Sequence, residues 1–213
     1  DGQGGQLASS MQGVAGLAQR IIAPSRSLAD VVRQHLPHIN ITVQSHPDAE
    51  VDFPYPAPMQ SQLGEHEVMR VLCLGTFTPE KGAAVLSRVA RLASRHKQPV
   101  EFSLLGESLY PLPSSVAVSG AYQDVDLDRL IRDRAPHLLW LPAQVPETWC
   151  YTLSAGLRAG LPILASDIGA LSERLSGRPA TRLLSPRSSP EVWLKALLAM
   201  RRQMIRGGGV VEW

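Results

Sequence analysis

Short apolar runs alternate with helical patterns along this chain, and this alternation limits the possible folds more than any other feature. Strand-like apolar runs occur at residues 21–23, 41–43, 71–74, 100–105, 116–118, 138–141 and 163–165. Between them, apolar residues recur at helical spacing, most clearly in 83–93 and 127–135. Strands that alternate with helices form right-handed crossovers and a mostly parallel sheet. The sequence therefore predicts an α/β protein with a Rossmann-like, doubly wound parallel sheet.

The pattern also indicates a division of the chain. Residues 68–213 are expected to form one Rossmann-like domain, whose last helix is broken by the glycines at 207–209. Residues 1–67 are interpreted either as the tail of a preceding domain with its linker or as an extra layer of the same domain. Within them, Ser25 is predicted to cap a helix that follows the run at 21–23. The proline-rich stretch 47–68 is predicted to be a loop or linker.

Composition excludes several classes of protein. The chain is 44% hydrophobic, but no apolar run approaches the length of a membrane span. The first six residues are polar and glycine-rich, unlike a signal peptide, and the absence of an initiator Met suggests a fragment or a processed chain with an upstream domain. A net charge of +2 with 5% aromatic residues argues against a dedicated nucleic-acid binder.

Metal, disulfide and dinucleotide chemistry are also disfavoured. The two cysteines, Cys73 and Cys150, exclude a disulfide framework by their number, and Cys73 is predicted to be a core residue because it lies in an apolar run. The six histidines show no pair at metal-binding spacing. Neither a Gly-x-Gly-x-x-Gly motif nor a Walker loop occurs, which disfavours a dinucleotide or ATP site. We therefore expect a cytoplasmic protein without a metal or cofactor.

The most informative local pattern is at residues 146–154, where a polar loop with one acid, Glu147, connects an apolar strand to a helix. Free N–H groups at the start of a helix attract phosphate. An acid beside them is unsuited to holding phosphate but accepts hydrogen bonds from hydroxyl groups. Phosphate and hydroxyls side by side indicate a sugar nucleotide. The alternative is that Glu147 only caps the following helix.

Three other strand ends are candidates because ligands bind beyond the carboxyl ends of parallel strands. Lys81 precedes a helix that begins near Gly82, where its charge could hold a diphosphate, although it could equally be an exposed turn residue. Gly106 would allow a ligand to approach closely, or it simply makes a turn. Tyr122 could flank a nucleotide base, or it packs in the core. Trp149 is interpreted as a packed aromatic residue.

Taken in order, these segments resemble the C-terminal, donor-binding domain of a retaining glycosyltransferase of family 4, also called group 1, which has two Rossmann domains (GT-B). The resemblance runs from residue 21 to the last helix and is closest to bacterial enzymes that build O-antigen or related surface polysaccharide. The motifs that carry it are Ile22-Ala23-Pro24-Ser25, Gly75 with Lys81-Gly82, Gly106, Pro146-Glu147-Thr148, Ala159-Gly160-Leu161-Pro162, and Asp167-Ile168-Gly169-Ala170 with Glu173.

The resemblance implies roles for individual residues. Lys81 would hold the donor diphosphate, Glu147 would bind the transferred sugar near its reacting carbon, and both would be catalytic. Backbone N–H groups from Trp149 to Thr152 would surround the phosphates, and Gly106 and Tyr122 would line the nucleoside pocket. The complete expected donor site contains Gly75, Thr76, Lys81, Gly106, Tyr122, Glu147, Thr148, Trp149, Cys150, Tyr151, Thr152 and Ala155, and no metal.

Two positions depart from the pattern of that family. The second acid of its Glu-x7-Glu pair, which usually holds the ribose, falls on Ala155. An arginine that commonly follows the glycine of the first loop falls on Thr76. Loss of the ribose acid removes a charge-assisted hydrogen bond of about 1.5–3 kcal/mol unless another group replaces it.

The implied function is transfer of a sugar, with retention, from a nucleotide-diphosphate sugar to a glycan or lipid-linked acceptor in surface polysaccharide or lipopolysaccharide synthesis. Catalysis would also need an N-terminal Rossmann domain that this chain does not supply in full, and the protein would lie in the cytoplasm or at the inner face of the membrane. Two alternatives are a degenerate, non-catalytic sugar-nucleotide or scaffold domain, which Ala155 and Thr76 favour, and a sugar-nucleotide epimerase.

Overall fold

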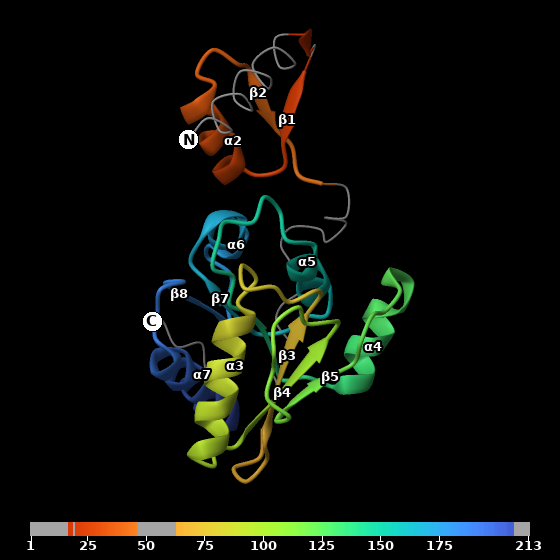
Figure 1. The fold of residues 1–213 in the computed structure, drawn as a ribbon, viewed down its shortest axis with the longest axis vertical. Coiled ribbons are helices and arrows are strands. Elements are labelled where there is room, and N and C mark those ends of the chain that lie inside the picture. Colours follow the sequence, from red (N-terminus) through yellow and green to blue (C-terminus); the bar gives the residue numbers. More distant parts are fainter. Residues whose placement is uncertain (1–16, 19, 47–62, 207–213) are drawn as a thin grey trace.

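The structure, a computed structural model, describes residues 17, 18, 20–46 and 63–206 of the 213-residue chain. The predicted break of the last helix at the glycines and most of the predicted linker lie outside the described residues. The first strands and helix form a small unit: β1 (Ile21–Ala23), α2 (Arg26–His35) and β2 (Ile41–Val43). The remaining elements form the main body (Figure 1). They are β3 (Met69–Leu74), α3 (Ala83–Arg95), β4 (Val100–Leu105), β5 (Val116–Val118), η1 (Asp124–Asp126), α4 (Leu127–Arg134), β6 (Leu138–Leu141), α5 (Tyr151–Arg158), β7 (Ile163–Ser166), α6 (Gly169–Leu175), β8 (Thr181–Leu184) and α7 (Pro190–Ile205).

The main body contains a parallel sheet with the strand order β5-β4-β3-β6-β7-β8. The chain begins at the centre with β3, moves outward to β5, returns to the other side of β3 and moves outward again to β8. This order is that of a doubly wound Rossmann fold, and the predicted fold class is confirmed. The point at which the direction of winding changes lies between β3 and β6.

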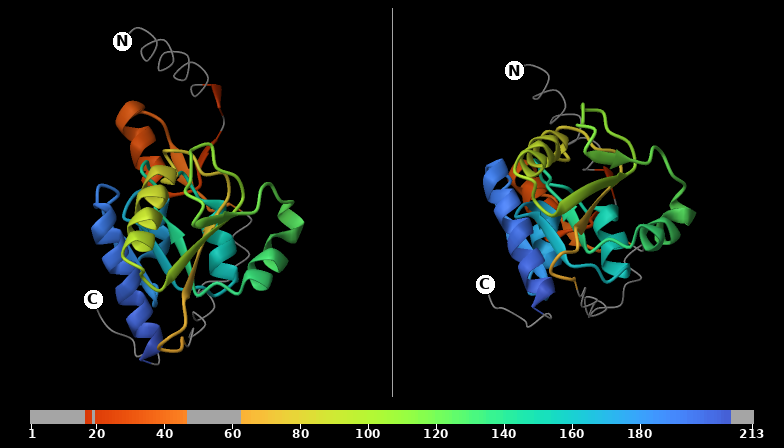
Figure 2. Two further views of the ribbon diagram at one scale, coloured as in Figure 1. Left: turned by 60° about the horizontal axis from the view of Figure 1, so that its bottom comes forward. Right: turned by 90° about the horizontal axis from the view of Figure 1, so that it is seen from below.

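Helices cover both faces of the sheet, and each face has its own apolar core (Figure 2). α3 and α7 pack side by side over one face, around the buried Trp140 and Trp193 rings, whose centroids are 5.7 Å apart. α4, α5 and α6 cover the other face, where Leu139 and Leu153 are fully buried. Cys73 is buried in the first of these cores, as predicted.

The sequence did not predict β8. Its four residues, Thr181–Leu184, are all half-buried, and β8 pairs with β7 at the edge of the sheet. A half-buried strand that begins Thr-Arg lacks the continuous apolar run that marked the central strands, so its position is decided by pairing with β7.

The small N-terminal unit is built around a parallel pair, β1 and β2, with α2 packed on it. Ala23, Ala29 and Ile41 form its core. Ser25 caps α2, as predicted, because its hydroxyl accepts the Leu28 N–H at 3.2 Å. Figure 1 shows the unit beyond the carboxyl edge of the main sheet, where α2 packs against α6. It therefore lies at the edge where a doubly wound sheet binds its ligands.

None of the described helices is both long enough and apolar enough to cross a membrane.

Candidate functional site

Lys81 and Glu147 meet at the point where the winding of the sheet changes direction. Lys81 follows β3 and Glu147 follows β6, and the Lys81 Nζ lies 3.7 Å from the Glu147 Oε2. Both side chains retain contact with solvent, with exposed fractions of 39% and 20%. They lie in a pocket whose lining residues are Leu74, Phe77, Lys81, Leu141, Ala143, Glu147 and Thr152. The fold thus brings together the two residues expected to be catalytic, which are 66 positions apart in the sequence.

The loop after β3 is held by close backbone contacts. The Lys81 N–H donates to the Thr78 carbonyl at 3.1 Å, and α3 begins directly after Gly82. Gly82 has a φ of 90°, and a Cβ at this position would lie 2.1 Å from the Pro142 carbonyl oxygen. Only glycine fits such a position. Because Pro142 follows β6, this contact fixes the loop of Lys81 against the loop of Glu147.

Gly106 supports the same loop from the neighbouring strand end. It has a φ of 136°, and a Cβ there would lie 2.2 Å from the Gly75 carbonyl oxygen. Gly75 in turn lies close to the Thr152 side chain on the first turn of α5. The ends of β3 and β4 and the start of α5 therefore pack closely together beside the pocket.

The loop after β6 is connected to the elements around it through its carbonyl groups. The Glu147 carbonyl accepts the Ala170 N–H of α6 at 3.1 Å, and the Thr148 carbonyl accepts the Ser25 hydroxyl at 2.8 Å. The loop ends at Cys150, which has a φ of 72° and directly precedes α5. Burial, with a smaller effect of the nearby Glu147 carboxylate, raises the pKa of the Cys150 thiol to about 12. The thiol is therefore protonated at neutral pH and is not a nucleophile.

The remaining expected site residues are distributed differently. Thr76 and Thr148 are exposed, and Tyr151 is 58% exposed with its ring 5.5 Å from that of His46. Trp149 is buried, in agreement with its interpretation as a packed aromatic residue.

Three of the expected donor-binding residues, Tyr122, Cys150 and Ala155, pack in the core on the face covered by α4, α5 and α6. Tyr122 is half-buried there, and burial, together with Asp124, raises its pKa. Ala155 is fully buried in the same core and faces apolar neighbours.

The sequence did not indicate the contacts between the N-terminal unit and the site. Glu173, on α6, accepts the backbone N–H groups of Arg26 and Ser27 at 3.0 and 2.9 Å. The His46 ring packs edge-on against Trp149, with 5.8 Å between the ring centroids. Ser25 and Glu173 each had a sequence signal, as a predicted cap and as a motif residue, but their partners across this contact are more than 120 positions away.

No group of three or more His, Cys, Asp or Glu side chains with the arrangement of a metal site occurs in the described ranges 20–46 and 63–206.

Comparison with solved structures finds the same fold in glycosyltransferases. HepE from Anabaena, solved in complex with UDP-glucose, is 16% identical, with a TM-score of 0.67 over 94% of this chain and 60% of the HepE chain. Sucrose-phosphate synthase from Thermosynechococcus elongatus is 13% identical, with a TM-score of 0.65 over 94% of this chain and 53% of that chain. The C-terminal domain of LpcC, a glycosyl transferase group 1 family protein from Francisella tularensis, is 15% identical, with a TM-score of 0.50 over 72% of this chain and 91% of that domain.

This chain therefore spans 60% or less of the length of HepE and of the synthase. The likeness confirms the expected GT-B glycosyltransferase fold. No protein-family model matches the sequence, and no curated protein matches it either.

Proposed function

We propose that this chain is the nucleotide-sugar-binding part of a glycosyltransferase. The observation that carries the proposal is the meeting of Lys81 and Glu147 beside the start of α5, between the ends of β3 and β6. A cation and free helix N–H groups suit a diphosphate, and an acid next to them suits the hydroxyls of a sugar. HepE, which has the same fold, binds UDP-glucose.

The proposed reaction transfers the sugar, with retained anomeric configuration, to a glycan or lipid-linked acceptor in surface polysaccharide or lipopolysaccharide synthesis. Lys81 and the N–H groups at the start of α5 stabilise the negative charge that develops on the leaving diphosphate. Glu147 binds the transferred sugar. No metal is required in this scheme, because Lys81 and the helix start supply the positive electrostatic field. The motifs at 22–25, 146–148 and 159–162 resemble those of group 1 glycosyltransferases and support this enzyme class. With that resemblance, the proposed location is the cytoplasm or the inner face of the membrane.

The Lys81–Glu147 pair also suggests how the donor enters. A partly exposed pair at 3.7 Å contributes little to stability, so a diphosphate can replace the carboxylate as the partner of Lys81. The carboxylate is then free to accept hydrogen bonds from the sugar.

Calorimetric titration with UDP, GDP and their glucose conjugates tests the proposal. Lys81→Ala is expected to weaken binding of the diphosphate by about 10- to 150-fold, the effect of one charge-assisted hydrogen bond. Glu147→Ala is expected to leave UDP or GDP binding intact and to weaken only the sugar conjugate. Lys195→Ala, which changes an exposed lysine on α7, is the control. Failure of the wild-type protein to bind any of these ligands contradicts the proposal.

A second candidate is a degenerate domain that binds the sugar nucleotide without catalysis. Ala155 favours it, because this position has no carboxylate to hold the ribose and its side chain is buried among apolar neighbours. The two candidates differ in one measurement. A protein that contains this chain with its complementary Rossmann domain transfers sugar if the first is correct and only binds the donor if the second is. This chain alone is expected to transfer sugar poorly or not at all.

A further inference from the structure

Arg174, on α6, has a buried guanidinium group directed at the loop that precedes α5. It is 8% exposed, and its Nη1 donates to the carbonyls of Trp149 and Cys150 at 2.8 and 2.9 Å. Its Nη2 donates to the Ser154 hydroxyl at 2.8 Å, and its Cζ lies 3.8 Å from the centre of the Trp149 ring. Across the described segments, no carboxylate lies within ion-pair distance of this guanidinium.

These bonds complete a regular arrangement in the loop. Four consecutive carbonyls, from residue 147 to residue 150, each accept a hydrogen bond from outside the loop. Ala170 and Ser25 each hold one carbonyl, and Arg174 holds the last two. A single side chain thus fixes the two peptide groups that lead directly into α5.

The direction of these carbonyls determines the direction of the neighbouring N–H groups. In a trans peptide the carbonyl of one residue and the N–H of the next point in opposite directions. The loop follows β6, which lies between β3 and β7. Ala170 and Arg174 belong to α6, which follows β7, so the carbonyls that they hold point toward α6. The N–H groups of Thr148, Cys150 and Tyr151 consequently point away from α6, and β3 lies on the side of β6 opposite to β7.

A comparison with two other buried arginines shows what is particular to Arg174. Arg178 and Arg201 are also buried and also donate to backbone carbonyls. Arg201 bridges the carbonyls of Glu65 and Glu67, at 2.7 and 2.6 Å, close to the amino end of β3. Bridging two carbonyls with a buried guanidinium is therefore a structural device that this fold uses more than once. Of these three arginines, Arg174 is the one that bridges two carbonyls of the loop before α5, the loop that carries Glu147.

We propose that Arg174 is a positioning residue for the diphosphate of the donor. It turns the peptide groups before α5 so that their N–H groups face the phosphate site, and it places a buried positive charge behind them. This role offsets the absence of an arginine at Thr76. The inference rests on the proposed function, because it assigns a residue to the same donor site.

The experiment compares diphosphate with monophosphate. UDP and UMP, and in parallel GDP and GMP, are titrated into the whole chain and into Arg174→Met, Arg174→Lys and the matched control Arg201→Met. The ratio of diphosphate to monophosphate affinity is the readout, and the unfolding midpoint of each variant is measured alongside. Loss of packing alone lowers both affinities together and leaves the ratio unchanged, whereas loss of the oriented N–H groups lowers the ratio.

We expect the ratio to fall by about tenfold or more in Arg174→Met, which corresponds to one charge-assisted hydrogen bond. Arg174→Lys is expected to fall between the wild type and Arg174→Met, because lysine keeps the charge but not the planar fork that holds two carbonyls. Arg201→Met is expected to lower the unfolding midpoint without changing the ratio.

An unchanged ratio in Arg174→Met overturns the inference. If that variant does not fold, an unchanged ratio in Arg174→Lys overturns it instead. If wild-type protein binds none of the four nucleotides, it is the proposed function that fails, and this outcome is distinct from an unchanged ratio in the variants.

Discussion

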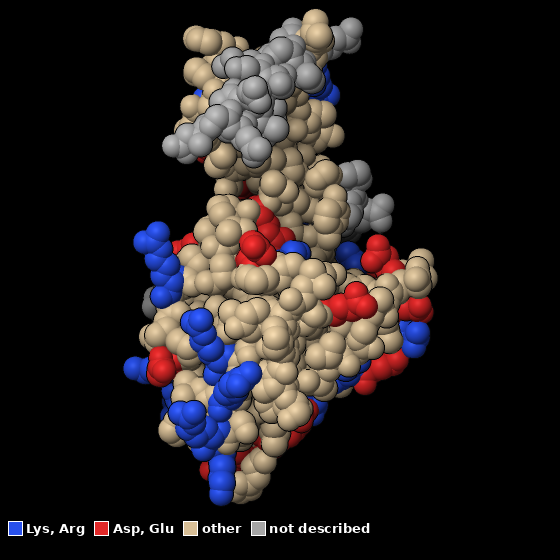
Figure 3. Space-filling view, in the orientation of Figure 1, with Lys and Arg blue, Asp and Glu red and all other residues tan. Residues whose placement is uncertain are grey.

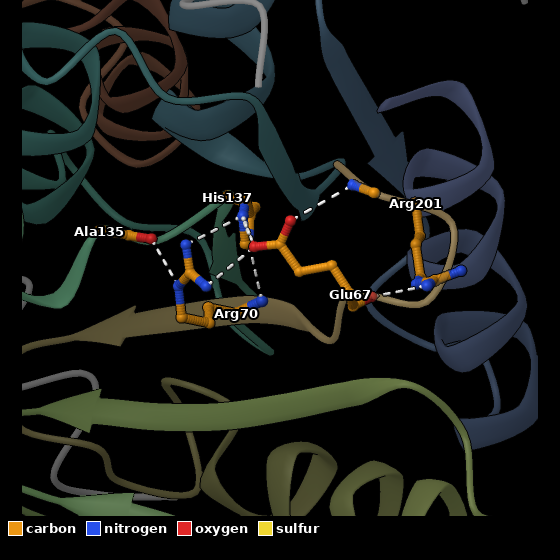
Figure 4. Close-up of polar contacts among 6 residues, drawn as sticks. Glu67, Arg70, Ala135, His137 and Arg201 are labelled. Carbon is orange, nitrogen blue, oxygen red and sulfur yellow. Dashed lines mark hydrogen bonds and ion pairs between the residues drawn. The ribbon is translucent and has the colours of Figure 1, made fainter. Parts of the chain in front are cut away.

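His137 and Glu67 lie in a polar cluster beside the amino end of β3 (Figure 4). The pocket lies beyond the carboxyl ends of β3 and β6. The His137 Nδ1 accepts the backbone N–H of Arg70 at 3.0 Å, and its Nε2 lies 3.3 Å from a Glu67 carboxylate oxygen. Arg201 donates to the carbonyls of Glu65 and Glu67, so α7 is attached to the same segment. The cluster therefore connects the start of β3 to β6 and α7.

This environment favours the neutral form of the His137 ring. Burial is the largest influence that lowers its pKa, followed by the Arg70 guanidinium, while Glu67 and Glu101 act in the opposite direction. A proton on Nδ1 would also remove the hydrogen bond from Arg70. Because the pKa is lower in the folded state than in the unfolded state, the unfolded chain takes up the proton first as the pH falls.

The first prediction concerns this histidine. The free energy of unfolding is expected to be highest above about pH 6.5, the ordinary pKa of histidine, and to decrease as the pH falls through the lowered pKa of His137. His137→Gln is expected to show a shallower slope in this range, because it removes the titrating ring and leaves the rest of the sequence unchanged. Denaturant unfolding at a series of pH values measures both slopes, and equal slopes would show that His137 is not responsible.

At the scale of elements, α2 and α6 share a capping arrangement that joins the N-terminal unit to the loop of Glu147. α2 has no acidic residue in its own first turn. Glu173 of α6 supplies one by accepting the N–H groups of Arg26 and Ser27, and Ser25 accepts the N–H of Leu28. A carboxylate at this end of a helix is favoured by the helix dipole. Because the Ser25 hydroxyl also donates to Thr148, the docking of α2 is linked to the loop of Glu147.

The second prediction follows from this cap. Glu173→Gln keeps only one acceptor oxygen and loses the charge, so it is expected to destabilise α2 locally by about 0.5–2 kcal/mol. Amide hydrogen exchange in residues 26–35 measures the effect. Glu191→Gln is the matched control, because Glu191 is an exposed acid in the first turn of α7. Unchanged protection of α2 in Glu173→Gln would mean that the cap does not stabilise the N-terminal unit.

At the scale of the whole molecule, the exposed arginines of α3 lie away from the pocket. Figure 3 shows Lys and Arg side chains gathered over α3, at the end of the molecule away from the N-terminal unit. α3 carries the exposed Arg88, Arg91 and Arg95, and it has no acid in its sequence. Arg91 and Arg95 lie toward the carboxyl end of α3, where positive charge interacts favourably with the helix dipole. The pocket itself is formed at the other end of α3, where the loops after β3 and β6 meet.

The third prediction concerns the stability of the whole molecule with ligand. A nucleotide diphosphate that binds only the folded chain, at about 100 times its dissociation constant, stabilises it by about 2.7 kcal/mol. For a chain of this size, that stabilisation raises the unfolding midpoint by roughly 5–10 °C. Thermal unfolding with UDP and with GDP measures the shift, which Lys81→Ala should reduce strongly at the same ligand concentration. A shift of the same size in Lys81→Ala would place the ligand elsewhere on the molecule.

Local sequence determined the central elements and indicated the candidate site. The runs at 100–105 and 138–141 are the strands observed near the centre of the sheet, because the apolar character of a buried strand is independent of its neighbours. The run at 116–118 is also observed, as the edge strand β5. Lys81 and Glu147 were identified because each lies in a loop between a strand and a helix, which is a local property. The parallel sheet then brings the ends of such strands to one edge.

Tertiary structure decided what depends on partners distant in the sequence. β8 forms through pairing with β7, Ala155 and Tyr122 pack in the core by the way α5 and α4 lie on the sheet, and Glu173 acquires its role from α2. Arg174 has no motif of its own, since an arginine in an amphipathic helix usually faces solvent. Its function as a bridge between carbonyls exists only where the folded chain brings α6 against the loop before α5. Sequence therefore determines where strands end and which residues follow them, whereas the folded structure determines what those residues contact.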